Sequence, residues 1–214
     1  MDAPRDLIVD LFADPTCPWC YVGWRALLAA AETRPDVTVR IIWRPFLLRP
    51  DAPAEGVDRK AFFAERMKSD PERWTAMRQA LVDAAAALDA PLNPDAPTRM
   101  PNAIDAQRVM VWALGQDKVA PVAEAMFRAY WVDGRDLGDH DVLADIAAEG
   151  GLDRAVVRDL LAGDADRDAI LAHHANAHRM GVSAVPAFVF ARKFSRIGAE
   201  SPDIYRRAID AALA

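Results

Sequence analysis

The strongest constraint on the fold is a pair of cysteines that stand three positions apart at the expected start of a helix. Cys17 and Cys20 are the only two cysteines among 214 residues. They follow a short apolar run, Leu7–Phe12, which indicates a buried strand, and they precede apolar residues that recur at helical spacing. The chain is therefore expected to run strand, turn, helix here, with both thiols in the first helical turn.

This placement favours a reactive dithiol. Side chains three apart on a helix have Cβ atoms about 5–6 Å apart, and a disulfide needs about 3.5–4.5 Å, so a small tightening would join Cys17 to Cys20. A helix N-terminus stabilises a thiolate and lowers its pKa, and Pro18 suits the first helical position because no N–H is needed there. Cys17 is expected to be the exposed, attacking sulfur and Cys20 the resolving one.

Strand, turn, Cys-X-X-Cys and helix is an order typical of a thioredoxin-like redox site. If the two cysteines were only small buried hydrophobic residues, this spacing at a helix start would not be required. A zinc site is a further alternative, because His174 and His178 lie four apart on an expected helix and could add two ligands. A c-type haem attachment needs histidine at position 21, which is Tyr. We expect redox chemistry, with no metal and no cofactor.

Composition excludes several classes of function. Just over half of the residues are apolar, enough for a full core. The net charge of −6 without a basic run gives no support for nucleic-acid binding. No apolar stretch approaches the ~20 residues of a membrane span, and the first residues lack the apolar core of a secretory signal. We expect a cytoplasmic protein without membrane contact. In that compartment a lone Cys-X-X-Cys pair is more often catalytic or metal-binding than a structural disulfide.

The remaining elements complete a split α/β order. A second strand is predicted over Val37–Trp43, continued by Phe46–Leu48, which with the first helix implies a parallel βαβ unit. Helical patterns then run from Arg59 to Gly181, and Asp164 is expected to cap the last helix. Strands return at 187–191 and 194–197, followed by a helix that opens at Ser201. The simplest account is one sheet interrupted by an all-helical insertion.

Several segments resemble one known family. The sequence is similar to the DsbA-like thioredoxin-fold oxidoreductases, closest to the FrnE type, which are related to kappa-class glutathione transferases and 2-hydroxychromene-2-carboxylate isomerases. The segments that carry the resemblance are 14–21, 43–46, 127–130 with 134–136, 181–186 and 198–199. The resemblance implies a thioredoxin fold in two parts, 1–54 and 177–214, around a helical insertion domain at 55–176.

The resemblance also implies roles for individual residues. Cys17 and Cys20 would be catalytic, and a cis Val185–Pro186 bond would lie beside their disulfide, with the Val185 backbone free to pair with a substrate peptide. The supporting residues of the site would be Pro18, Trp19, Val185, Pro186 and Asp14.

Two departures from the relatives refine this expectation. Periplasmic DsbA has histidine where this chain has Trp19, so we expect a less stabilised Cys17 thiolate and a milder oxidant. Kappa-class transferases have serine at the first cysteine position. Cys17 therefore argues against simple glutathione activation, although glutathione could still act as a redox partner.

Two acidic residues have alternative interpretations. Asp14 either caps the loop before Cys17, which turn statistics favour, or accepts a proton near the site. Asp10 lies in the buried strand, where an unpaired acid is costly. It either takes the proton of Cys20 or is held in a salt bridge.

The sequence predicts thiol–disulfide exchange on a protein or small-thiol substrate. Cys17 would form the mixed disulfide and Cys20 would resolve it. The alternatives are a glutathione-dependent transferase or 2-hydroxychromene-2-carboxylate-type isomerase on the same fold, and a zinc-binding, chaperone-like module. A homodimer is an open option for the assembly.

Overall fold

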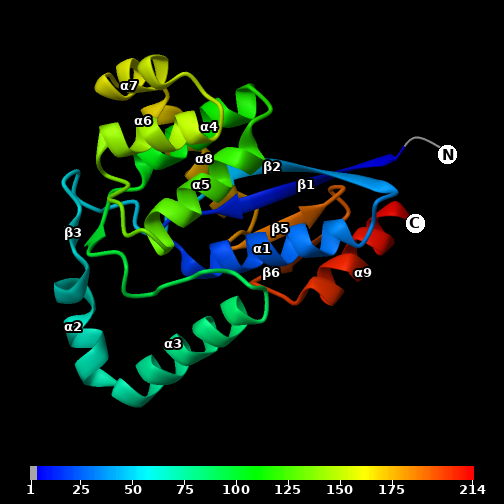
Figure 1. Cartoon of the computed structure of the whole chain (residues 1–214), viewed down its shortest axis with the longest axis horizontal. Coiled ribbons are helices and arrows are strands. Elements are labelled where there is room, and N and C mark those ends of the chain that lie inside the picture. The colour runs from blue at the N-terminus through cyan, green and yellow to red at the C-terminus, as the bar shows by residue number, and fades with distance from the viewer. Residues whose placement is uncertain (1–3) are drawn as a thin grey trace.

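The computed structural model describes residues 4–214, without the side chains of residues 65 and 66. Its centre is a four-stranded sheet in the order β2-β1-β5-β6 (Figure 1). The strands are β1 (Arg5–Ala13), β2 (Val37–Pro45), β5 (Ala187–Phe190) and β6 (Phe194–Ile197). β1 and β2 are parallel and the other two pairings are antiparallel, which confirms the predicted βαβ unit and terminal hairpin.

Two helices cover one face of this sheet. α1 (Pro18–Glu32) and α9 (Pro202–Leu213) pack against each other, and α9 also contacts β1 and β5. Alternate residues of β1 point into this layer, since Leu7, Val9 and Leu11 are at most 2% exposed while Ile8 is 42% exposed. The opposite face is partly covered by a later helix, α8.

The segment between β2 and β5 contains the other helices. They are α2 (Arg59–Ser69), α3 (Pro71–Ala86), α4 (Ile104–Gly115), α5 (Val119–Trp131), α6 (His140–Glu149), α7 (Arg154–Ala162) and α8 (Arg167–Arg179). α4 and α5 pack on β2, whereas α2 and α3 extend away from the sheet (Figure 1). This segment also holds two-residue strands, β3 (Val57–Asp58) and β4 (Arg99–Met100), and α8 crosses position 176/177. The domain boundaries given above stay a prediction.

A buried polar contact joins the helices to the sheet. Gln107 of α4 is 0% exposed and accepts a hydrogen bond from Trp43 Nε1 at 2.7 Å. Its amide nitrogen donates to the carbonyl oxygens of Ala13 and Phe46, both at 2.8 Å. All of its polar atoms are thereby engaged, and the carboxyl ends of β1 and β2 are held in place immediately before the cysteine loop.

The structure corrects two sequence predictions. β2 ends at Pro45, because Leu47 N–H donates to His174 Nδ1 and Leu48 N–H to Asp14 Oδ2 rather than along a strand. α8 is preceded by Asp166 instead of Asp164, and Asp166 adopts a left-handed φ of 62°. The Asp166 carboxylate accepts from Trp112 Nε1 and makes no cap. In the described part of the chain, no helix combines the length and apolarity needed to cross a membrane.

Candidate active site

The two cysteines occupy the first turn of α1. Cys17 is the N-cap residue, Pro18 is the first helical residue, and Cys20 N–H donates to the carbonyl of Cys17 at 3.1 Å. Both thiols are free. Cys20 is 0% exposed, as a resolving sulfur should be, but Cys17 is only 5% exposed, so the expected exposure of its sulfur is wrong. The reason is tertiary, because the carbonyl oxygen of Val185 lies 3.9 Å from Cys17 Sγ.

The loop before Cys17 is fixed by Asp14. Its Oδ1 accepts from the backbone N–H and the hydroxyl of Thr16 at 2.8 and 2.7 Å. Its Oδ2 accepts from Leu48 N–H at 2.8 Å, and its carbonyl accepts from Cys17 N–H at 3.0 Å. Trp131 of α5 adds a bond from its indole nitrogen to the carbonyl of Pro15 at 3.1 Å. These contacts confirm the loop-capping interpretation of Asp14.

The segment that enters β5 closes the other side. The Val185–Pro186 peptide bond is cis, as the family resemblance implies. Gly23 of α1 faces this proline, and a Cβ there would lie 3.0 Å from Pro186 Cγ and 3.2 Å from Phe188 Cζ. A larger residue at position 23 would therefore push α1 away from the segment beside Cys17.

Burial controls the protonation of two groups at the site. Burial, with the hydrogen bond to Cys17, raises the pKa of the Cys20 thiol. Burial also raises the pKa of Asp14, against the opposing effect of its hydrogen bonds to Leu48 and Thr16. The backbone of Asp14 opposes this effect through a hydrogen bond that lowers the Cys20 pKa, whereas the Asp14 charge raises it. In the resting state Cys20 is thus held as a neutral thiol next to the sulfur it would attack.

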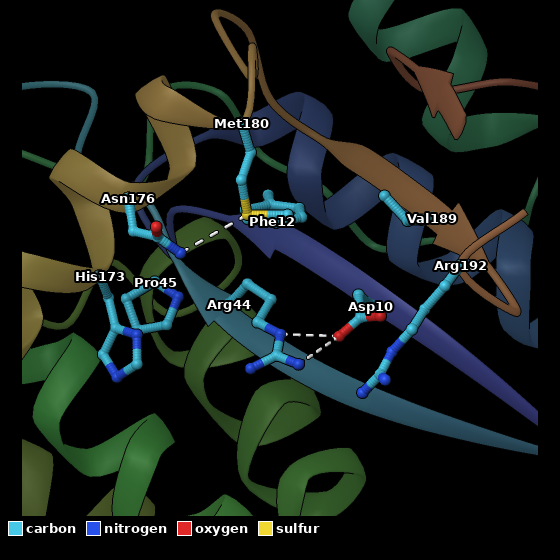
Figure 2. Close-up of a pocket in the computed structure, with 9 residues that line it drawn as sticks. All are labelled: Asp10, Phe12, Arg44, Pro45, His173, Asn176, Met180, Val189 and Arg192. Atoms are coloured by element: carbon cyan, nitrogen blue, oxygen red, sulfur yellow. Dashed lines mark hydrogen bonds and ion pairs between the residues drawn. The ribbon is translucent and has the colours of Figure 1, made fainter. Parts of the chain in front are cut away.

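Asp10 belongs to a different part of the molecule. It lines a cavity of about 390 Å³ (Figure 2). Arg44 Nε and Nη2 contact its Oδ1 there at 2.7 and 2.6 Å. Because strand side chains alternate in direction, Asp10 points to the face opposite Leu11 and the α1 layer. The salt-bridge interpretation is therefore correct, and the role of Asp10 as proton acceptor for Cys20 is wrong.

The histidine pair is engaged in packing. His174 Nδ1 accepts from Leu47 N–H at 3.2 Å, and the His174 and His178 rings both lie about 5 Å from Phe46. Burial lowers the pKa of His174. The described residues contain no group of three or more histidine, cysteine or acidic side chains placed to hold a metal. The two cysteines and two histidines do not form the set that the zinc alternative requires.

A large cavity adjoins the cysteines. Its volume is about 940 Å³, and it lies between the residues that flank Cys17 and the helices α2 and α3. Residues around it include Thr16, Pro18, Trp19, Arg49, Phe62, Phe63 and Trp74. Sequence analysis identified Pro18 and Trp19 but missed the α2–α3 wall, because no local motif shows that this distant segment returns to the cysteines.

A dithiol at the N-terminus of the helix of a parallel βαβ unit, with a ββα unit completing the sheet, defines the class of thioredoxin-fold proteins. Residues 8–210 match the model of the DSBA-like thioredoxin domain, and the chain belongs to that family.

Solved structures agree with this assignment. The chain is similar to the probable DsbA oxidoreductase SCO1869 from Streptomyces coelicolor, with a TM-score of 0.86 and 25% identity over 97% of this chain and 90% of that one. It shares its fold with the cytosolic disulfide reductase DsbM from Pseudomonas aeruginosa, solved with GSH, at a TM-score of 0.62, 21% identity, and coverage of 96% and 98%. A 2-hydroxychromene-2-carboxylate isomerase has the same fold at a TM-score of 0.73, 17% identity, and 96% coverage of both chains.

Proposed function

We propose that this protein is a thiol–disulfide oxidoreductase that works through Cys17 and Cys20. The observation that carries the proposal is the placement of the pair, with Cys17 as N-cap of α1 and Cys20 one turn inside, fully buried. Exchange needs one thiol that reaches a substrate and a second that is held close and attacks only after a mixed disulfide has formed.

The reaction follows from this arrangement. The Cys17 thiolate attacks one sulfur of a substrate disulfide, the other substrate sulfur leaves as a thiolate, and a mixed disulfide forms. Cys20 then gives up its proton and attacks Cys17 Sγ. The second substrate thiolate then leaves. The substrate disulfide has gained two electrons, and the protein has lost two in forming the Cys17–Cys20 disulfide. Oxidation of a substrate dithiol is the same sequence reversed.

Neighbouring residues support these steps. Pro18 and Trp19 form the cavity side of the helix start. The Val185 carbonyl accepts from Cys17 Sγ at 3.9 Å, and its second lone pair can accept from an extended substrate backbone. Asp14, with its pKa raised by burial next to Cys20, is suited to receive the Cys20 proton in addition to capping the loop. The raised pKa of the Asp14 carboxyl lies closer to that of the Cys20 thiol, which donates the proton.

Insulin disulfide reduction driven by dithiothreitol tests the proposal. The wild-type protein should accelerate the reaction, and Cys17→Ser should abolish the acceleration. Reduced Cys20→Ser, freed of dithiothreitol and then mixed with insulin, should instead accumulate a mixed disulfide, which mass spectrometry detects as substrate-sized added mass that later addition of dithiothreitol removes. Full activity in Cys17→Ser would refute the assignment.

We further propose that glutathione is the small-thiol redox partner and that the protein works in the cytoplasm. The support is that a dithiol–disulfide pair can exchange with the glutathione pool that buffers the cytoplasm. Oxidation of the reduced protein by glutathione disulfide, followed by mass spectrometry, tests the partner, and fractionation of cells tests the compartment. Dimer formation stays a prediction, which light scattering would check.

A further inference from the structure

The cavity beside Cys17 is lined by a guanidinium group that has an unpaired hydrogen-bond donor. Arg49 follows β2, and its Cζ lies 4.3 Å from the centroid of the Phe62 ring. Its Nη1 is buried and has no hydrogen-bond partner among the described residues. A buried donor left unpaired costs free energy, and more so when it is charged. Arg49 is also one of the residues that line the cavity, and a guanidinium group with an unsatisfied donor favours an oxyanion as its partner.

A second arginine that lines the cavity is also held by aromatic rings. Arg59, at the start of α2, lies 5.3 Å from the ring centroid of Phe63 and 5.8 Å from that of Trp131. It is half-buried, and this burial lowers its pKa. Within the part of the chain that the structure describes, no carboxylate forms an ion pair with either arginine. Both are held by aromatic rings, which leaves their N–H groups free for a ligand.

The acidic residues close to this cavity are already engaged. Asp58 accepts from Ala61 N–H at the start of α2, and Asp95 is ion-paired with Arg78. Asp14, which feels the charge of Arg49, has its two oxygens bound to Thr16 and Leu48. Among the described residues, the cavity is lined by four cationic side chains, Arg49, Arg59, Lys60 and Arg78, and by two acidic ones, Asp58 and Asp95, so positive charge is in excess there.

We propose that this cavity binds disulfides and thiols that carry a carboxylate on an aromatic or apolar body, with Arg49 as the residue that selects the anion. The inference rests on the proposed exchange activity and names its substrate class. The volume of about 940 Å³ holds a drug-sized molecule. Rings of Trp19, Phe63 and Trp74 supply the apolar walls, and Arg49 supplies the fixed charge.

The chemistry is the exchange already described, applied to a small aromatic disulfide. The Cys17 thiolate attacks one sulfur and an aromatic thiolate leaves. Cys20 then attacks Cys17 Sγ and releases the second aromatic thiolate. The protein dithiol is oxidised to a disulfide, and one substrate disulfide is reduced to two thiols.

A matched pair of substrates tests this proposal. The reduced protein is mixed with 5,5′-dithiobis(2-nitrobenzoate) or with its uncharged bis(carboxamide), and each rate is divided by the rate with dithiothreitol alone. The wild type should prefer the dicarboxylate. Arg49→Met, which keeps a long apolar side chain over Phe62, should slow the dicarboxylate about tenfold or more, in line with loss of a charge-assisted hydrogen bond, and leave the carboxamide within about twofold.

Arg192→Met is the matched control. Arg192 lines the distant cavity around Asp10 and, like Arg49, has no ion pair among the described residues (Figure 2). This variant loses the same charge and should react as the wild type. The proposal is overturned if the wild type shows no preference for the dicarboxylate, if Arg49→Met slows both disulfides equally, or if Arg192→Met has the same effect as Arg49→Met.

A binding measurement separates this proposal from the exchange activity. Calorimetry on Cys17→Ser compares 3-nitrobenzoate with 3-nitrobenzamide, and only the benzoate should bind, with the difference lost in Cys17→Ser/Arg49→Met. If the anion is selected but neither disulfide is reduced by the wild type, the exchange activity is wrong and the binding site is correct. Equal binding of both probes overturns the inference.

Discussion

Gln107→Met is expected to destabilise the protein strongly, because Gln107 is the contact that fixes the strand ends below the cysteine loop. The substitution keeps a similar volume but leaves two buried partners unpaired, namely Trp43 Nε1–H and the carbonyl of Phe46, while the Ala13 carbonyl still accepts from Phe46 N–H. At about 1 kcal/mol for each, the low end for an unsatisfied buried group, the free energy of unfolding should fall by about 2 kcal/mol.

Urea denaturation followed by tryptophan fluorescence measures this loss. For a slope of about 3 kcal/mol/M, the upper end for small proteins, the midpoint should fall by about 0.7 M. Gln79→Met is the control, because Gln79 is exposed on α3 and bonds only Asp83. It should change stability by less than about 0.5 kcal/mol. If the two variants have the same midpoint, the contacts of Gln107 do not hold the strand ends.

Three further substitutions or conditions have defined outcomes. Arg44→Met should lower the free energy of unfolding by about 3 kcal/mol, which is the low end for breaking a buried ion pair because the Arg44 side chain is 35% exposed. Adding Asp10→Asn should recover part of this loss in the same urea assay. The pKa of Cys20 is raised above its ordinary 9.0 in the folded protein, so the unfolded chain loses this proton at lower pH. The reduced protein should therefore lose stability as the pH rises past 9.0. Thermal melts of Cys20→Ala should lack this part of the decline. Gly23→Ala should cost about 1–3 kcal/mol by crowding Pro186, measured as a lower melting temperature with slower exchange by Cys17.

Local signals were sufficient to predict the sheet and the dithiol. The alternation along β1 and β2, the proline after Cys17 and the apolar run at β5 are properties of neighbouring residues, and the structure has strands and the helix start there. The family resemblance added the cis Val185–Pro186 bond, which no local rule would supply.

Contacts between distant segments could not be predicted from these signals. Gln107 looks like an ordinary polar residue in a helix, yet its partners include Ala13, 94 positions away. The exposure of Cys17 was misjudged because Val185, 168 positions away, lies against its sulfur. The run Leu7–Phe12 is apolar at both alternating sets of positions. It therefore does not show which face of the sheet the Asp10 side chain points to.

The most direct test of the account is the reduction potential of the Cys17–Cys20 pair, measured by equilibrating the protein in glutathione redox buffers and quantifying free thiols by alkylation and mass spectrometry. We expect a single two-electron transition, which should be absent in Cys17→Ser. Its midpoint should lie below the value of about −120 mV for DsbA, because Trp19 replaces the histidine of that motif. Two thiols that stay alkylatable in excess glutathione disulfide would contradict the redox function, and a midpoint at or above that value would contradict the role assigned to Trp19.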